Sequence, residues 1–141
     1  MKPKVFIAKP IPQEVEDFIA EHCDYKIWKG NGPIPEGELW KEIADVEGIM
    51  TPKGMITEDF LRHAPKLKVV SNIAVGYDGF DIEAMKARNV IGTHTPYVLD
   101  DSVADLVFGL ILATSRRIVE FNQYVKEGKW NHHLDSQEFF G

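Results

Sequence analysis

The sequence of 141 residues is poor in cysteine and has no excess of positive charge. Cys23 is the only cysteine, so no disulfide bond can form within the chain. The formal net charge is -6 at pH 7, and no run of basic residues stands out. We therefore expect neither nucleic acid nor an anionic membrane surface as a partner.

The sequence also lacks a long apolar run and a leader-like start. The longest apolar stretch covers residues 106–113, far fewer than the roughly 20 residues that span a bilayer. Residues 1–4 lead only into a short apolar run that ends at Lys9 and Pro10, which is unlike a signal peptide. With 44% hydrophobic and 27% charged residues, the chain is expected to form one globular domain or slightly more, in the cytoplasm.

Several chemical motifs are missing as well. The sequence has no G-x-x-x-x-G-K-[ST] phosphate loop, and it has no G-x-G-x-x-G, because Gly30-Asn31-Gly32 is followed by Pro33. No serine has the surroundings of a catalytic nucleophile. His132 and His133 are adjacent and do not share one face of a regular element, so we expect no metal site. The residues alone indicate no complete catalytic set.

What is present is a regular alternation of short strands and helices. We expect strands at residues 4–8, 25–28, 48–51, 67–71 and 90–93, and helices at 13–22, 39–46, from Thr57 to before Pro65, and 81–87. Strands that alternate with helices of about ten residues predict a parallel sheet with right-handed crossovers. The expected fold is α/β, a flavodoxin-like doubly wound parallel five-stranded sheet in the order 2-1-3-4-5.

A long helix is expected after Pro96. Asp100 or Asp101 can cap its start, and Ser102-x-x-Asp105 has the spacing of a capping box. Apolar residues then recur at helical spacing as far as Gly128, which predicts about 27 unbroken helical residues. The first half is apolar nearly all round and needs a second surface, either another domain or a partner chain. Residues 129–141 have no clear period and are expected to form a loop.

The stretch from Ser71 to Asp81, read as SNIAVGYDGFD, lies between an apolar strand and the start of a helix. Such a loop presents backbone N–H groups to an anion, and it lies at the carboxyl edge of the sheet, together with the loops at residues 8–12 and 51–54. The alternative is an ordinary turn whose glycines provide a positive φ. Asp78 and Asp81 are better explained as a turn former and a helix cap than as an acid pair.

Residues from about Met50 onward resemble the D-isomer-specific 2-hydroxyacid dehydrogenases, and within them the glyoxylate and hydroxypyruvate reductases. The family's substrate loop has a Ser, a Val-Gly pair and two Asp residues three apart, here Ser71, Val75-Gly76, Asp78 and Asp81. Its T-P-x-V-L-x-D hinge, followed by an A-[DE] pair, is here Thr95–Asp101 and then Ala104-Asp105. The long helix with Arg116-Arg117, and then Gly128-x-Trp130, is also similar to the family. Residues 1–49 fit by their strand and helix pattern rather than by motif.

The resemblance implies a role for several residues. In the family, the backbone N–H groups at the positions of Val75 and Gly76 receive the carboxylate of a small 2-keto or 2-hydroxy acid. Lys53 lines the same cleft, although a solvated loop lysine is an equal interpretation. Leu99, Asp100 and Ser102 resemble positions that approach the nicotinamide of NAD or NADP. For Asp100 a capping role alone is equally open.

The resemblance also implies what this chain does not contain. The family's dinucleotide fingerprint and its catalytic Arg, Glu and His lie downstream of Gly141, so no catalytic residue is assigned here. Residues 1–98 are expected to be the substrate-binding domain without its C-terminal segment, and residues 99–141 the first helix and loop of the cofactor domain. We expect no activity from this chain alone, and a homodimer through the helix from Val103 to Val125. Neither the hydroxy acid nor the choice between NAD and NADP follows from the sequence.

Two alternatives belong to other functional classes. One is a stand-alone flavodoxin-like module that binds small anions without catalysis, including a regulatory module for hydroxy acids. The other is a receiver module, which needs an acidic cluster after its first strand and a phosphoacceptor Asp after its third. Lys9-Pro10 and Thr51-Pro52 stand at those positions, so the receiver is disfavoured.

Overall fold

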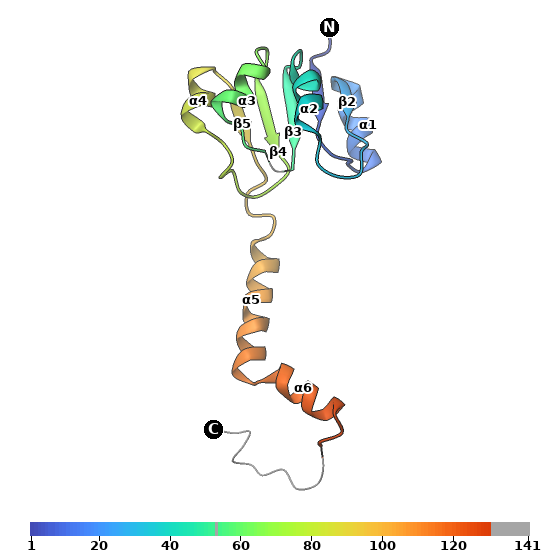
Figure 1. Ribbon diagram of the computed structural model, residues 1–141, viewed down its shortest axis with the longest axis vertical. Helices are drawn as coiled ribbons and strands as arrows, with labels where there is room; N and C mark the ends of the chain where they lie inside the picture. The colour runs from blue at the N-terminus through green and yellow to red at the C-terminus, as the bar shows by residue number, and fades with distance from the viewer. Residues whose placement is uncertain (53, 131–141) are drawn as a thin grey trace. The chain divides into compact units, whose positions relative to one another are not determined.

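The structure, a computed structural model, describes residues 1–52 and 54–130, which divide into two compact units between Val98 and Leu99. The first unit holds one five-stranded sheet (Figure 1). Its strands are β1 (Lys4–Ile7), β2 (Asp24–Ile27), β3 (Gly48–Thr51), β4 (Val69–Asn72) and β5 (Ile91–Thr93). Every pair is parallel, and the order is β2-β1-β3-β4-β5. The predicted fold class and strand order are confirmed, with strand ends that differ from the prediction by up to two residues.

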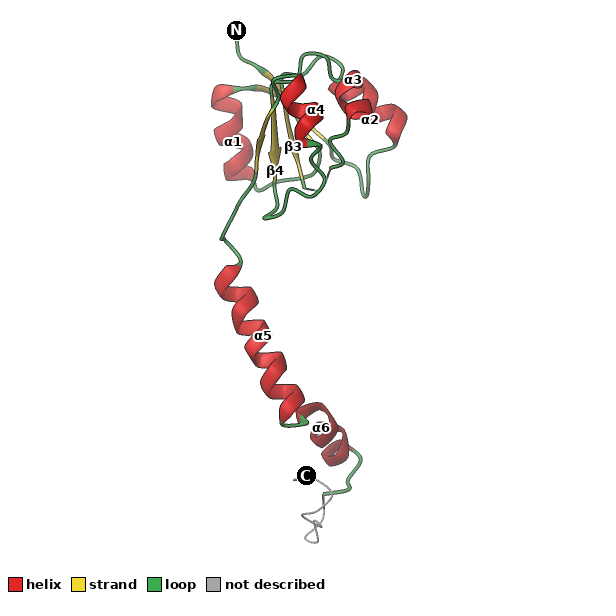
Figure 2. Cartoon of the chain, turned by 90° about the vertical axis from the view of Figure 1, so that its left-hand side faces the viewer, coloured by secondary structure: helices red, strands yellow, loops and turns green. Residues whose placement is uncertain are grey.

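Four helices connect these strands. They are α1 (Gln13–His22), α2 (Glu36–Ile43), α3 (Glu58–His63) and α4 (Ile82–Ala87). Figure 2 shows α1 on one face of the sheet and α2, α3 and α4 on the other. Helix α2 begins earlier than predicted, because Pro35 at its N-cap has a fixed φ that suits a helix start. It ends at Ile43, so Val46, which the prediction of residues 39–46 included, lies outside the helix.

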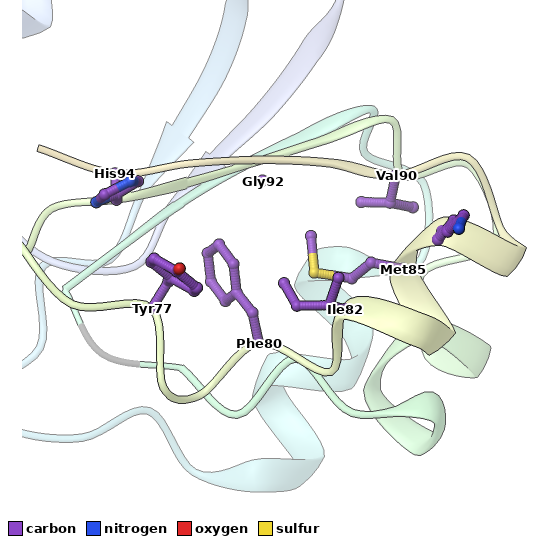
Figure 3. Close-up of a pocket in the computed structure, with 8 residues that line it drawn as sticks. Tyr77, Phe80, Ile82, Met85, Val90, Gly92 and His94 are labelled. Carbon is purple, nitrogen blue, oxygen red and sulfur yellow. The ribbon is translucent and has the colours of Figure 1, made fainter. Parts of the chain in front are cut away.

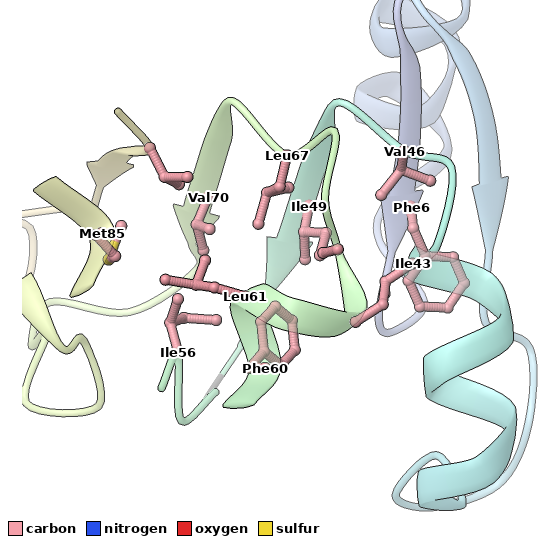
Figure 4. Packing of buried hydrophobic residues seen from close by; sticks show 12 residues of the cluster. Phe6, Ile43, Val46, Ile49, Ile56, Phe60, Leu61, Leu67, Val70 and Met85 are labelled. Carbon is pink, nitrogen blue, oxygen red and sulfur yellow. The ribbon is translucent and has the colours of Figure 1, made fainter. Parts of the chain in front are cut away.

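The hydrophobic core lies between the sheet and helices α2, α3 and α4 (Figure 4). Its fully buried side chains come from β1, α2, α3, β4 and the segment before α3, and they are Phe6, Ile43, Leu61, Val70 and Ile56. Burying each such side chain stabilises the fold by about 1.5–3 kcal/mol. Ile56 lies after the loop that follows β3, and Val70 lies before the loop that follows β4, so the core holds one end of each loop.

The second unit contains two helices, α5 (Asp100–Ser115) and α6 (Ile118–Lys126). The prediction of one unbroken helix to Gly128 is therefore wrong. Arg117 adopts a left-handed conformation with φ 51° and ψ 36°, and its N–H bonds to the carbonyl of Thr114 at 3.1 Å. The Ser115 hydroxyl donates to the Leu112 carbonyl at 3.2 Å. Hydroxyl side chains of this kind compete for backbone groups and weaken a helix, which explains the break.

The start of α5 also differs from the prediction. Leu99 is the N-cap residue, and no side chain caps this helix end. Asp100 and Asp101 instead occupy the first turn, where their negative charges interact favourably with the helix dipole. Ser102 is already inside the helix, so the predicted caps and the Ser102–Asp105 capping box are wrong. Among the residues that the structure describes, no helix is long and apolar enough to cross a membrane.

Candidate functional site

The loops after β3 and β4 are joined at the carboxyl edge of the sheet. Ile73 donates its N–H to the Thr51 carbonyl at 2.8 Å. Ile56 donates its N–H to the Gly79 carbonyl at 2.8 Å and accepts a hydrogen bond from the Asp81 N–H at 3.0 Å. Ile56 also forms an isolated parallel bridge with Phe80. These backbone bonds hold the two loops as one structure.

Gly79 allows this close approach. A β-carbon at this position would lie 2.2 Å from the carbonyl oxygen of Gly54, closer than any real side chain. Neither Gly76 nor Gly79 has a positive φ. The alternative that these glycines serve to provide left-handed backbone is therefore wrong, and Gly79 is required because two backbones meet. Asp81 caps α4 by accepting the Ala84 N–H at 3.0 Å, as predicted.

The carbonyl groups of residues 74–77 are all engaged within the first unit. Each accepts a hydrogen bond from a neighbouring strand end or from the loop itself. The pairs, acceptor first, are Ala74 with the Thr95 N–H at 3.1 Å, Val75 with His94 Nδ1 at 2.8 Å, Gly76 with Asn72 Nδ2, and Tyr77 with the Phe80 N–H at 2.9 Å. His94 also packs edge-on against Tyr77, with ring centroids 5.0 Å apart. The loop therefore has its carbonyls fixed.

The N–H groups of the same loop are unused. Within residues 1–52 and 54–130, no protein acceptor is bonded to an N–H of residues 74–79. A trans peptide is planar, so a carbonyl and the next N–H point in opposite directions. Fixing the carbonyls of Ala74 and Val75 consequently turns the N–H groups of Val75 and Gly76 away from Thr95 and His94. Two successive unpaired N–H groups form a ready site for an anion.

One negative charge lies near this loop. Oδ2 of Asp78 lies 3.4 Å from the place that a β-carbon on Gly76 would occupy. The Asp78 side chain is in an exposed residue, so water screens its charge. This charge would repel an anion at Gly76. Hydrogen bonds from the backbone N–H groups would have to outweigh that repulsion.

The sequence analysis pointed to this loop, and it missed two of the side chains that shape it. Asn72 is the last residue of β4 and is only 7% exposed. The sequence feature that could have identified Asn72 is a polar residue at the end of a buried strand. His94 directly follows β5, and its ring donates the hydrogen bond that fixes the Val75 carbonyl.

The other predicted site residues belong to the second unit or lie outside the described residues. Leu99, Asp100 and Ser102 lie at the start of α5 in the second unit, and all three are exposed. Lys53, His132 and His133 lie outside the described residues. Among the described residues, no group of three or more His, Cys, Asp or Glu side chains is arranged to hold a metal ion.

Two cavities flank the joined loops. One of about 470 Å³ lies beside β5 and α4, with Phe80 packed under Gly92 and with Tyr77 and His94 at one end (Figure 3). The other, of about 640 Å³, is lined by Ala8, Lys9, Thr51, Pro52 and residues of α2. It lies beyond the carboxyl ends of β1 and β3, which is where ligands of doubly wound sheets bind.

Clear shifts in pKa occur away from this loop, in exposed ion pairs. The side-chain hydrogen bonds from Lys4 and Lys66 lower the pKa of Asp45 to about 2. The Arg88 guanidinium lowers the pKa of Glu58 through two hydrogen bonds, with Nη2–Oε1 at 2.7 Å and Nε–Oε2 at 3.3 Å. The same guanidinium donates to the Leu61 carbonyl at 3.1 Å, which connects α3 to the end of α4. These pairs stabilise the scaffold, and none of them involves residues 74–77.

Known proteins resemble both the sequence and the fold. The family model of the D-isomer specific 2-hydroxyacid dehydrogenase catalytic domain matches residues 5–132. Glyoxylate/hydroxypyruvate reductase B of Serratia proteamaculans (strain 568) is 40% identical over 139 residues, which cover 99% of this chain and 43% of that protein. The chain thus spans less than half the length of this relative.

Two solved structures have a similar fold. An NADPH-dependent glyoxylate/hydroxypyruvate reductase from Sinorhizobium meliloti, in complex with NADP and malonate, is 28% identical with a TM-score of 0.66; the match covers 92% of this chain and 40% of that chain. D-lactate dehydrogenase from Aquifex aeolicus, complexed with NAD and lactic acid, is 25% identical with a TM-score of 0.73; the match covers 94% and 39%. Together with the family model, these likenesses extend over the sheet, the joined loops, α5 and α6. The chain therefore belongs to the D-isomer specific 2-hydroxyacid dehydrogenase family.

Proposed function

We propose that this chain forms the substrate-binding part of an oxidoreductase that transfers a hydride between NAD or NADP and a small 2-keto or 2-hydroxy acid. Glyoxylate and hydroxypyruvate are the favoured substrates, since they appear in the name of a relative that is 40% identical. The solved relatives hold NADP with malonate and NAD with lactic acid. The observation that carries the proposal is the loop of residues 74–77, with fixed carbonyls and unpaired N–H groups.

The role of this loop is to anchor the substrate. The N–H groups of Val75 and Gly76 donate to the carboxylate that every 2-keto acid carries, and hydrogen bonds to a charged acceptor are stronger than neutral ones. Anchoring that end of the molecule fixes its orientation, which is the main contribution of a binding loop to the reaction. Lys53, which lies outside the described residues, is included only because of the resemblance to the family, as a positive charge for the substrate. No residue of this chain is assigned a catalytic acid or base.

The cofactor belongs with the second unit. Residues 99–141 form the beginning of the cofactor domain, and residues 1–98 the substrate domain. Leu99, Asp100 and Ser102 lie within the first turn of α5 and its cap, where exposed groups can contact the nicotinamide end of NAD or NADP. When bound, the cofactor supplies or accepts the hydride. The cytoplasmic location expected from the sequence stays a prediction.

A titration with small carboxylates tests the anchoring role. In the ¹⁵N-labelled chain, oxamate should shift the amide signals of Val75 and Gly76, and neutral oxamide, which lacks the carboxylate, should leave them unchanged. Equal responses to both compounds, or none to oxamate, would contradict the proposal. Separately, the chain should not oxidise NADH or NADPH in the presence of glyoxylate, and measurable turnover would overturn the expected inactivity.

A second candidate is a module that binds small anions without any catalysis. It is favoured by one observation, namely that the groups bonded to the carbonyls of residues 74–77 all lie within residues 72–95 of the first unit. Adding NADH or NADPH separates the two candidates. In a longer chain that includes the family's downstream cofactor domain, a substrate-binding part of a dehydrogenase should show cofactor-dependent signal changes at Leu99, Asp100 or Ser102, and an anion module without catalysis should show none.

We also propose that the chain forms a homodimer through α5 and α6. Most apolar residues of these helices are exposed, among them Leu106 at 62%, Phe108 at 66% and Val119 at 73%. A contiguous apolar surface of this kind is typical of an interface. We therefore keep the residues from Val103 to Val125 as the proposed interface. These residues belong to two helices and not to one.

A further inference from the structure

Asn72 holds a position that an apolar residue would fill more favourably. It ends β4 and is 7% exposed, with its Nδ2 donating to the Gly76 carbonyl. Its Oδ1 is buried and has no hydrogen-bond partner among the described residues. A buried acceptor without a partner lowers stability, because the group has lost its bonds to water. Asn72 therefore lowers the stability of the fold through its unpaired Oδ1. What it contributes is the hydrogen bond from its Nδ2 to the Gly76 carbonyl.

That hydrogen bond controls one particular N–H group. The peptide unit between Gly76 and Tyr77 contains the Gly76 carbonyl and the Tyr77 N–H, which point in opposite directions. All peptide bonds of the described residues are trans. By holding the Gly76 carbonyl, Asn72 fixes the Tyr77 N–H on the side away from itself. Without Asn72, this peptide unit in an exposed part of the loop is free to rotate and to bond water through either group.

The same relationship holds for the two preceding peptide units. The Thr95 N–H fixes the Ala74 carbonyl at 3.1 Å and hence the Val75 N–H. His94 Nδ1 fixes the Val75 carbonyl at 2.8 Å and hence the Gly76 N–H. Asn72 continues this series by one residue. Three consecutive peptide units are each oriented by a donor from outside the loop or from the strand end, and none of their N–H groups has a protein acceptor within the described residues.

We infer that the carboxylate-binding loop has a third donor, the N–H of Tyr77, and that Asn72 is the positioning residue that orients it. This inference rests on the proposed anchoring by Val75 and Gly76. A third N–H explains how a loop next to the Asp78 carboxylate binds an anion, since each added charge-assisted hydrogen bond offsets part of that repulsion. It also explains why a buried asparagine with an unpaired oxygen persists at the end of β4.

The test compares the wild-type chain with Asn72→Leu, which has a similar shape and no amide. Oxamate should slow the hydrogen exchange of the Val75, Gly76 and Tyr77 amides in the wild type. In Asn72→Leu, the protection of Tyr77 should be lost, that of Val75 should persist, and the affinity for oxamate should fall about tenfold, the effect of one hydrogen bond to a charged group. The melting temperature should be unchanged or higher. Thr93→Val, at the end of the neighbouring strand, should change none of these quantities.

The possible outcomes separate the two proposals. Protection of Val75 and Gly76 without Tyr77 in the wild type overturns the third donor and leaves the anchoring intact. Unchanged protection of Tyr77 in Asn72→Leu overturns the role of Asn72. No protection of any of the three amides in the wild type removes the anchoring proposal and this inference together. If Asn72→Leu does not fold, Asn72→Ser, which is too short to reach Gly76, takes its place with the same expected results.

Discussion

Gly79 and Gly54 lie so close together that a β-carbon on Gly79 would be 2.2 Å from the Gly54 carbonyl oxygen. The contact is between two backbones, so no flexible side chain can move aside to relieve it. Residues 54 and 79 belong to the loops after β3 and β4, and the neighbouring Ile56 N–H bonds to the Gly79 carbonyl at 2.8 Å. The absence of a side chain at Gly79 is therefore a condition for the candidate site.

Replacing Gly79 by alanine should destabilise the first unit and weaken oxamate binding together. The loops have to separate to make room for the methyl group, and such overpacking typically costs roughly 1–3 kcal/mol. Urea unfolding followed by circular dichroism measures the change. Gly37→Ala is the matched control, because a β-carbon there meets nothing within 4 Å and lies inside α2. It should leave stability unchanged or raise it, and a similar loss in both variants would contradict the role of the Gly79 contact.

His94 should act on ligand binding through a single hydrogen bond. His94→Phe keeps an aromatic ring against Tyr77 and removes the donor to the Val75 carbonyl, so the Gly76 N–H is no longer held in place. We expect the affinity for oxamate to fall about tenfold, as for the loss of one hydrogen bond. His94→Asn can place an amide N–H near the position of Nδ1 and should retain most of the affinity. Equal affinity in His94→Phe and wild type, measured by amide shifts, would show that His94 does not orient the loop.

The strand order could be predicted from the sequence, and the break between α5 and α6 could not. Short apolar segments such as residues 48–51 are separated by helical patterns, and chain connectivity then leaves few topologies. The helical spacing of apolar residues continues from Leu110 through Ile118 to Phe121, so the pattern gives no sign of a break. Periodicity indicates which side chains share a face of a helix. It does not indicate that Arg117 adopts a left-handed backbone conformation.

The candidate site could likewise be located but not explained. A glycine-bearing loop after an apolar strand pointed to residues 71–81, and the resemblance to the family then pointed to Val75 and Gly76 within it. The groups that fix their carbonyls were not recognised, since His94 lies 19 residues away from Val75 in the chain. Parallel strands bring such distant residues together at one edge, and the pairing of individual side chains there follows only from coordinates. Asn72 is closer in sequence, but its importance follows from its burial.

Removing the charge of Asp78 should strengthen anion binding. Its carboxylate lies beside Gly76, and like charges repel across this distance even when water screens them. Asp78→Asn should raise the affinity for oxamate by about two- to fivefold at low salt, with a smaller gain at high salt. Glu83→Gln on α4 removes one charge at an exposed position outside the loop and serves as the control. A weaker affinity in Asp78→Asn would mean that this side chain assists the loop in another way.

The exposed apolar surface of α5 should drive self-association. Phe108 and Ile111 are 66% and 55% exposed, and burying such residues at an interface is favourable by the hydrophobic effect. The wild-type chain should sediment as a dimer in analytical ultracentrifugation at concentrations where Phe108→Glu with Ile111→Glu sediments as a monomer. Glu120→Lys with Lys126→Glu, which keeps the charge of α6 and its apolar residues, is the control. A monomeric wild type at high concentration would contradict the proposed interface.

Asp45 should make the stability of the first unit depend on pH below about 4. Its carboxylate accepts hydrogen bonds from Lys4, with Nζ–Oδ2 at 2.5 Å, and from Lys66. These bonds lower its pKa from 3.8 to about 2. A group with a lowered pKa in the folded state contributes its full stability above the unfolded value, and the contribution disappears as the pH falls through the folded value. Since the side chain is 53% exposed, screening keeps the contribution small.

Asp45→Asn should therefore be less stable than the wild type at pH 7, by an amount that stays constant down to about pH 4. The difference should shrink between about pH 4 and pH 2, because protonation then removes the same charge from the wild type. Urea unfolding at a series of pH values measures it, and high salt should reduce the difference at pH 7 by screening both lysines. A difference that persists unchanged at pH 2 would mean that Asp45 stabilises the fold by its shape and not by its charge.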